Sequence, residues 1–140
     1  MPFRMRKNVK VELLSRVPLF SGLSKAQLGQ VAMIADEIDL PAGTTVIREG
    51  ERGREFLVVI EGEVEVRRKG KRLAVLRDGE FVGEIALVSD IPRVATVTTC
   101  SPVRALVITD RQFRSLIQRV PTIALKVLDA VATRLPTAQF

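Results

Sequence analysis

The sequence contains no histidine and only one cysteine, Cys100. Without histidine the chain lacks Ser-His-Asp and Cys-His nucleophile systems, a histidine general base and histidine-ligated zinc. One thiol forms neither an internal disulfide nor a cysteine-cluster metal site, so nothing indicates a secreted, disulfide-stabilised fold. These absences exclude most familiar enzyme classes, including cupin-type enzymes that need histidine ligands. We therefore expect a protein that is not an enzyme and that has no cofactor.

Tryptophan and tyrosine are also absent, and aromatic residues make up only 4% of the chain. A base-stacking surface for single-stranded nucleic acid is therefore not expected. No segment approaches the roughly 18 uncharged apolar residues that a membrane span requires. The N-terminus, MPFRMRKNVKVELL, is basic but has no apolar run after it, so we expect no secretory signal. A cytoplasmic location is the resulting expectation.

What the sequence does contain is typical of a globular domain: 140 residues, 46% hydrophobic and 27% charged. The net charge of +6 favours anionic partners such as a nucleotide, a nucleic acid or a lipid surface. Basic residues concentrate at positions 67–72, around Gly70 and between two strand-like runs. This cluster predicts a solvated hairpin tip, with DNA or RNA contact as the alternative.

Helical patterns occur near both ends of the chain. We expect a short helix over Val9–Leu14. A second helix is expected after Ser24, which forms a capping box with Gln27 and precedes inward-facing Leu28, Val31, Ala32 and Ala35. Asp110 is the predicted N-cap of a helix over Arg111–Arg119, with Phe113, Leu116 and Ile117 facing inward. Pro121 suits the first turn of a last helix, whose expected apolar positions are Ile123, Ala124, Val127, Leu128, Val131 and Leu135.

Between these ends, short runs rich in Val, Ile and Leu are separated by glycines. The predicted strands are Thr44–Arg48, Glu55–Ile60, Glu63–Arg67, Arg72–Leu76, Ala95–Thr99 and Arg104–Ile108. Short strands with turns between them favour a small antiparallel barrel or roll. The predicted fold class is therefore α+β: an antiparallel, jelly-roll-like β-roll with N-terminal helices, a short helix within the roll and two C-terminal helices. We expect one domain over residues 1–140.

One segment, residues 81–97, interrupts the strand pattern in a way that suits a small phosphate. Gly83 precedes a short helix-competent turn, whose first amides, near Ile85 and Ala86, lack partners within the turn. Arg93 follows on the returning strand and offers a planar fork of donors. A carboxylate repels phosphate, so Glu84 is better matched to a neighbouring sugar hydroxyl. The alternative is that Glu84 and Arg93 simply pair and Gly83 is an ordinary turn residue.

This segment strongly resembles the phosphate-binding cassette of the cyclic nucleotide-binding domain family, which includes protein kinase A regulatory subunits and the catabolite activator protein. The matching residues are Phe81, Gly83-Glu84-Ile85-Ala86-Leu87 and Pro92-Arg93-Val94-Ala95-Thr96-Val97. Further similarities, in family order, are Pro18-Leu19-Phe20, Gly43, Gly50-Glu51, the run from Phe56 to Val64 and the two closing helices. The resemblance covers about residues 13–135, which is the expected domain core.

The resemblance implies a role for each cassette residue. Arg93 is expected to bind the cyclic phosphate, and Glu84 the ribose 2′-hydroxyl, while the amides of Ala86 and Ile85 complete a seat for which Gly83 makes room. With the adjoining Val94 and Ala95, these are the expected ligand-binding residues. Family members that prefer cyclic GMP often carry threonine directly after the arginine, whereas Val94 has no hydrogen-bonding side chain. The expected ligand is therefore cyclic AMP in preference to cyclic GMP.

The implied function is a non-catalytic sensor in which the ligand shifts the C-terminal helices. In the family the last helix usually covers the base, and Leu128, Val131 and Arg134 are the candidates here. Neither an output domain nor a DNA-reading element is recognisable, so we expect a separate effector protein or a regulatory fragment of a longer protein. A homodimer through the C-terminal helix is a further expectation. The alternative function is a degenerate fold that acts as a ligand-free protein-interaction domain.

Overall fold

The computed structural model describes residues 6–134, except the side chains of residues 131, 133 and 134. The chain divides into two compact units. One spans Asp36–Asp110 and holds the strands; the other combines the described residues up to Ala35 with those from Arg111 onward and is helical. A single domain over residues 1–140 stays a prediction.

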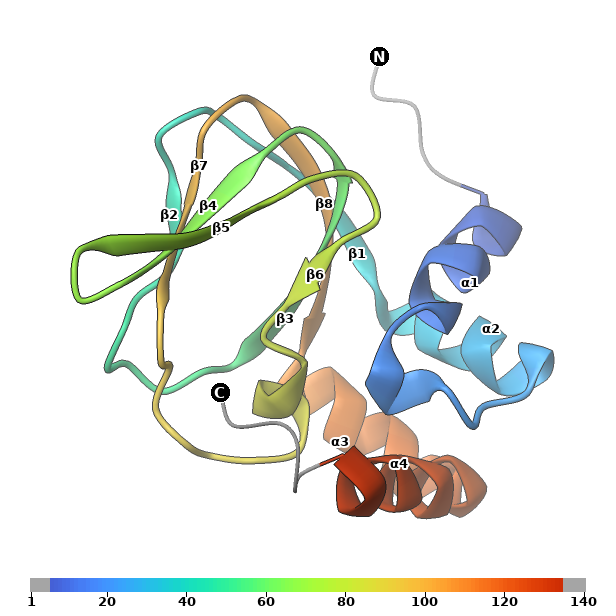
Figure 1. Cartoon of the computed structure of the whole chain (residues 1–140). Coiled ribbons are helices and arrows are strands. Elements are labelled where there is room, and N and C mark those ends of the chain that lie inside the picture. The colour runs from blue at the N-terminus through green and yellow to red at the C-terminus, as the bar shows by residue number, and fades with distance from the viewer. Residues whose placement is uncertain (1–5, 135–140) are drawn as a thin grey trace. The chain divides into compact units, whose positions relative to one another are not determined.

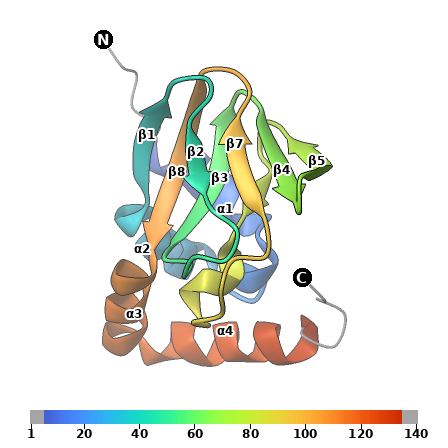
Figure 2. The same ribbon diagram turned by 90° about the vertical axis from the view of Figure 1, so that its left-hand side faces the viewer.

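The β unit consists of two four-stranded antiparallel sheets (Figures 1 and 2). The first has the order β1-β8-β3-β6, formed by β1 (Asp36–Leu40), β8 (Val103–Thr109), β3 (Glu55–Glu61) and β6 (Phe81–Val82). The second has the order β2-β7-β4-β5, formed by β2 (Thr45–Ile47), β7 (Thr96–Thr99), β4 (Val64–Arg68) and β5 (Lys71–Leu76). The predicted α+β class with an antiparallel β-roll is confirmed.

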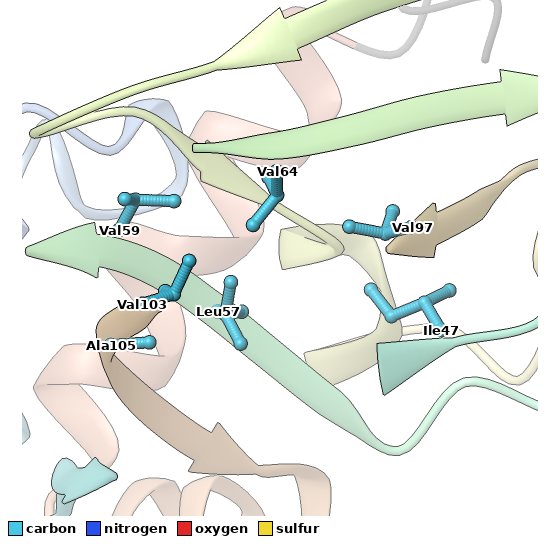
Figure 3. Close-up of a cluster of buried hydrophobic side chains, with 7 residues drawn as sticks. All are labelled: Ile47, Leu57, Val59, Val64, Val97, Val103 and Ala105. Atoms are coloured by element: carbon cyan, nitrogen blue, oxygen red, sulfur yellow. The ribbon is translucent and has the colours of Figure 1, made fainter. Parts of the chain in front are cut away.

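The core of the β unit lies between the two sheets. Figure 3 shows its buried side chains, which are Ile47, Leu57, Val59, Val64, Val97, Val103 and Ala105. Aliphatic and β-branched residues dominate this cluster because they pack well on pleated sheet faces. Thr99 is a buried polar residue of the same unit: its hydroxyl donates to the Pro41 carbonyl at 2.7 Å and accepts from the Thr44 amide at 2.8 Å.

All six predicted strands are present, each to within one residue at either end. Two further strands, β1 and β6, were not predicted. Strand β1 has the sequence DEIDL, and its acidic residues hide the apolar pattern. It forms because its backbone pairs with β8, where Ile38 lies opposite Ala105. Strand β6 is only two residues long and pairs with β3 at Leu57 and Val58. Both strands therefore form through pairing with segments that lie far away in the sequence.

The basic cluster forms the predicted hairpin tip, between β4 and β5. Lys69 and Gly70 have φ of 51° and 80°, as in a type I′ two-residue turn. The residues from Arg67 to Arg72 are all exposed, which confirms the solvated interpretation. The Lys69 amide donates to Glu49 Oε1 at 3.0 Å, so the tip is fastened to the segment that follows β2.

The helical unit contains α1 (Lys7–Ser15), the 3₁₀ helix η1 (Pro18–Phe20), α2 (Lys25–Ile34), α3 (Asp110–Arg119) and α4 (Pro121–Arg134). The capping box of α2 is confirmed: the Gln27 amide donates to Ser24 Oγ at 3.2 Å, and the Ser24 amide donates to Gln27 Oε1 at 2.9 Å. Pro121 opens α4, as predicted. Over residues 6–134, no helix combines the length and apolar character needed to cross a bilayer.

Within this unit the rings of Phe20 and Phe113 pack with centroids 5.8 Å apart. Gln27 joins α2 to α4, because its Oε1 also accepts from Lys126 Nζ at 2.8 Å. The buried stripe of α4 is Ile123, Val127 and Ala130. Leu128, one of the expected apolar positions of this helix, does not belong to the buried stripe: it is 64% exposed, because it lies about 100° around the helix from Val127. Leu135 and the side chain of Val131 lie outside the described part.

Candidate functional site

The segment singled out from the sequence lies in the β unit between β6 and β7. It contains a 3₁₀ helix, η2 (Glu84–Leu87), which is the short helix predicted within the roll and the small yellow turn of Figure 1. Buried Ala86 and Leu87 anchor η2, which packs against β3. Just before it, the Phe81 ring meets the Phe56 ring edge-on at 6.1 Å. Apolar contacts to β3 thus fix the position of this short helix.

Gly83 makes the turn from β6 into η2. Its φ is +84°, a left-handed conformation that glycine adopts without strain. A Cβ at this position would lie 3.0 Å from the Glu55 carbonyl oxygen and 3.3 Å from Arg93 Cζ. The absence of a side chain therefore serves both the turn and the close approach of the arginine.

Arg93 is held by the main chain of the loop that precedes β3. Its amide donates to the Glu51 carbonyl and its carbonyl accepts from the Gly50 amide, both at 2.8 Å. Next to it, Pro92 forms an isolated antiparallel bridge with Arg52. Two loops far apart in sequence are therefore joined at the position from which the guanidinium projects.

The Arg93 side chain lies in a narrow space between two glycines and is only 9% exposed. A Cβ on Gly53 would come within 2.7 Å of Arg93 Cζ and 2.8 Å of Cδ. Arg93 Nη2 donates to the main-chain carbonyl of Glu55. The same nitrogen lies 3.9 Å from Glu55 Oε2, in an ion pair whose carboxylate side chain is 51% exposed.

The charge of this guanidinium is poorly solvated. Burial lowers the pKa of Arg93 below its usual value, and the nearby Glu55 carboxylate partly opposes that change by favouring the charged form. A cation in such a place attracts anions strongly, because less water screens it. The arrangement fits the binding of a small anion beside Gly83.

The structure brings Gly83 and Arg93 together, as the sequence predicted. Glu84 opens η2 and is half-buried, as is Ile85. The prediction that the Ala86 amide lacks a partner within the turn is wrong: it donates to the Gly83 carbonyl at 3.1 Å, because a 3₁₀ turn bonds each amide to the carbonyl three residues earlier. The two other predicted residues follow Arg93 and lead into β7: Val94 is 43% exposed and Ala95 is half-buried.

Two residues at this site escaped the sequence analysis. Gly53 makes room for the Arg93 side chain, and Glu55 supplies its acceptor and its counter-charge. A glycine two residues before the start of an apolar strand was the available signal for Gly53. Nothing local marks Glu55, which lies 38 residues from Arg93 in sequence.

The other candidate residues from the sequence analysis are Leu128, Val131, Arg134 and Cys100. Leu128 on α4 is exposed, and the side chains of Val131 and Arg134 lie outside the described part. Cys100 is an exposed free thiol. Among the described residues, no group of three or more His, Cys, Asp or Glu side chains is placed to hold a metal ion.

Comparison with known proteins decides the family. The model of the cyclic nucleotide-binding domain matches residues 37–120, more than half of the chain and the whole segment just described. The chain belongs to the cyclic nucleotide-binding domain family. Such domains are non-catalytic and regulatory, in agreement with the expectation that this protein is not an enzyme.

Relatives of this cyclic nucleotide-binding domain occur in different regulatory proteins. A cAMP-dependent protein kinase regulatory subunit of Yarrowia lipolytica is 34% identical over 114 residues, which cover 80% of this chain and 30% of that protein. A CRP-like cAMP-activated global transcriptional regulator of Mycobacterium tuberculosis is 29% identical over 129 residues, which cover 89% of this chain and 58% of that protein. The chain thus spans less than two thirds of either relative.

Solved structures agree on the fold of the cyclic nucleotide-binding domain. The N-terminal domain of a transcriptional regulator from Streptomyces coelicolor superposes with a TM-score of 0.81 at 32% identity, covering 91% of this chain and 94% of that one. The family resemblance stated from the cassette residues is therefore confirmed.

Proposed function

We propose that the chain binds a cyclic nucleotide at residues 83–95 and that Arg93 holds the cyclic phosphate. The observation that carries the proposal is the nearly buried guanidinium beside Gly83, within the segment that the family model matches. One donor of this guanidinium is used by the Glu55 carbonyl, and the planar group has further N–H donors for phosphate oxygens. Support also comes from relatives named as cAMP-dependent or cAMP-activated.

In this proposal the other cassette residues orient the nucleotide. Glu84, at the start of η2, accepts a hydrogen bond from the ribose 2′-hydroxyl, where its negative charge is kept off the phosphate. Gly83 leaves the space the ligand needs, and the amides of Ile85 and Ala86 face the phosphate. The Ala86 amide then shares its proton between the Gly83 carbonyl and the ligand.

We expect cyclic AMP to bind more tightly than cyclic GMP. Val94 is partly exposed beside Arg93 and has no donor or acceptor in its side chain. A guanine amino group that loses water and gains no partner costs about 1–3 kcal/mol. In a titration with both nucleotides, Val94→Thr should raise the relative affinity for cyclic GMP, and an unchanged ratio would contradict this account.

The proposed output is a population shift of the C-terminal helices. Leu125 and Leu128 of α4 are 67% and 64% exposed and three residues apart. They are the large apolar side chains of this helix that are exposed among the described residues, and so they are available to cover a base, to meet an effector protein or to pair with a second copy. A separate effector or an output domain of a longer, cytoplasmic protein completes the proposal.

One observation favours the alternative, a ligand-free interaction domain. Arg93 already has an acceptor and a counter-charge in Glu55, so its donors are partly satisfied by the chain itself. A domain of this kind would keep the fold and bind neither nucleotide.

The deciding experiment is calorimetric titration of the protein with cyclic AMP and cyclic GMP, before and after Arg93→Leu. Two charge-assisted hydrogen bonds of about 1.5–3 kcal/mol each would be lost, so affinity should fall by about two orders of magnitude or more. Arg54→Leu is the matched control: it removes the same charge from an exposed neighbour of Gly53. An unchanged affinity after Arg93→Leu refutes its role, and no binding by the unaltered protein favours the alternative.

A further inference from the structure

Glu55 contacts Arg93 in two separate ways. It is the first residue of β3, and its main-chain carbonyl accepts from Arg93 Nη2. Its side-chain carboxylate lies 3.9 Å from the same nitrogen. One residue thus supplies both an anchor and a negative charge, and the two are distinguishable because one belongs to the backbone and the other to the side chain.

The anchor is fixed by the sheet. Glu55 lies opposite Thr109 in the antiparallel pairing of β3 with β8, and the preceding carbonyl, that of Arg54, accepts from the Asp110 amide at 2.8 Å. The Glu55 carbonyl therefore keeps its position whatever side chain the residue carries. A substitution at position 55 that preserves the strand leaves the Arg93 anchor in place.

The carboxylate acts through its charge. A separation of 3.9 Å exceeds the range of a hydrogen bond, and half of the Glu55 side chain is exposed. At this distance it attracts the guanidinium and repels any second anion that approaches the same cation. A phosphate bound by Arg93 would lie within several ångströms of the Glu55 carboxylate.

We propose that the Glu55 carboxylate sets the affinity of the site, because it competes with the cyclic phosphate for the charge of Arg93. This inference rests on the proposed function. The inference assigns a role in nucleotide binding to Glu55, a residue outside the predicted cassette, and that role is to weaken binding. The Glu55 carbonyl holds the Arg93 guanidinium in the orientation for binding, and the Glu55 carboxylate lowers the affinity of that guanidinium for the cyclic phosphate.

The test is Glu55→Gln, which removes the charge and retains the size and the strand. Cyclic AMP should bind about three- to tenfold more tightly, the effect of one charge several ångströms away near a protein surface. The matched control is Glu61→Gln, the same change at the exposed far end of β3. It should leave affinity within about twofold, because exposed charges beyond a Debye length are screened.

A second measurement separates charge from shape. Titrations at low and high ionic strength should show the advantage of Glu55→Gln shrinking as salt rises, since screening weakens the competition. A merely structural effect of the substitution would not follow salt in this way. Melting temperatures of both variants should stay close to that of the unaltered protein, because the contact is with a half-exposed carboxylate.

The outcomes are distinct. Weaker or unchanged binding of Glu55→Gln, with the unaltered protein binding normally, overturns this inference and leaves the proposed function standing. An equal gain in Glu61→Gln also overturns it, because net charge alone would then explain the effect. Binding by Glu55→Gln where the unaltered protein binds undetectably supports it. If neither protein binds, both the proposed function and this inference fail.

Discussion

At the scale of single residues, two glycines define the space in which Arg93 lies. Gly83 combines a left-handed backbone with close contact, so a side chain there meets both strain and the Glu55 carbonyl. Gly53 differs, because its backbone φ lies outside the left-handed region and only the closeness of Arg93 excludes a side chain. Substitution of Gly53 therefore tests the arginine's position with little disturbance of the backbone.

We expect Gly53→Ala to displace the Arg93 side chain and reduce cyclic nucleotide affinity by about tenfold or more, the equivalent of about 1.4 kcal/mol. The added Cβ would lie 2.7 Å from Arg93 Cζ, so the Arg93 side chain must leave its observed position. Titration of the variant measures the change. Gly22→Ala is the control, because its Cβ meets only Lys126 Cβ at an ordinary 3.8 Å. Full affinity in Gly53→Ala would show that ligand binding does not need the observed arginine position.

At the scale of secondary-structure elements, the turn of the β4–β5 hairpin contains a residue in a strained backbone conformation. Among residues 6–134, Lys69 is the one residue other than glycine that has a positive φ. A left-handed conformation costs a residue with a Cβ about 1 kcal/mol, and asparagine is the side chain most favoured at this position of a type I′ turn before glycine. This turn has the favoured glycine at position 70, but it has lysine where asparagine is favoured at position 69.

Lys69→Asn should therefore stabilise the protein by about 0.5–1 kcal/mol in chemical unfolding. The amide of residue 69 still donates to Glu49, so the fastening of the tip is unchanged. Lys71→Asn provides the comparison: it removes the same charge from the adjoining strand residue, where asparagine brings no turn benefit. Equal stabilisation by both variants would indicate relief of charge repulsion instead.

At the scale of the whole molecule, ligand binding and folding are linked. A nucleotide that binds only the folded chain adds about 2.7 kcal/mol of stability at a hundredfold excess over its dissociation constant. Cyclic AMP should therefore raise the melting temperature of the unaltered protein by several degrees, and the rise should disappear in Arg93→Leu. A rise of equal size in both proteins would place the ligand away from Arg93.

Much of the molecule was predictable where the signal is local. The capping box at Ser24 and Gln27 and the turn at Gly83 depend on neighbours within a few residues, and the sequence revealed them. Strand β1 and the pairing of Arg93 with Glu55 depend on segments far away in the chain, and no local pattern marks them. Leu128 shows a third limit: its apolar character fits either a helix core or an exposed functional face.

The carbonyl of Glu55 gives a nearly buried cation an acceptor from the protein's own backbone. Buried charges that lack such partners destabilise a fold. The backbone acceptor therefore offsets part of the cost of burying this charge, so the roll can fold before any nucleotide is bound. If the proposed function holds, a site that is already assembled can fill as soon as the nucleotide concentration rises.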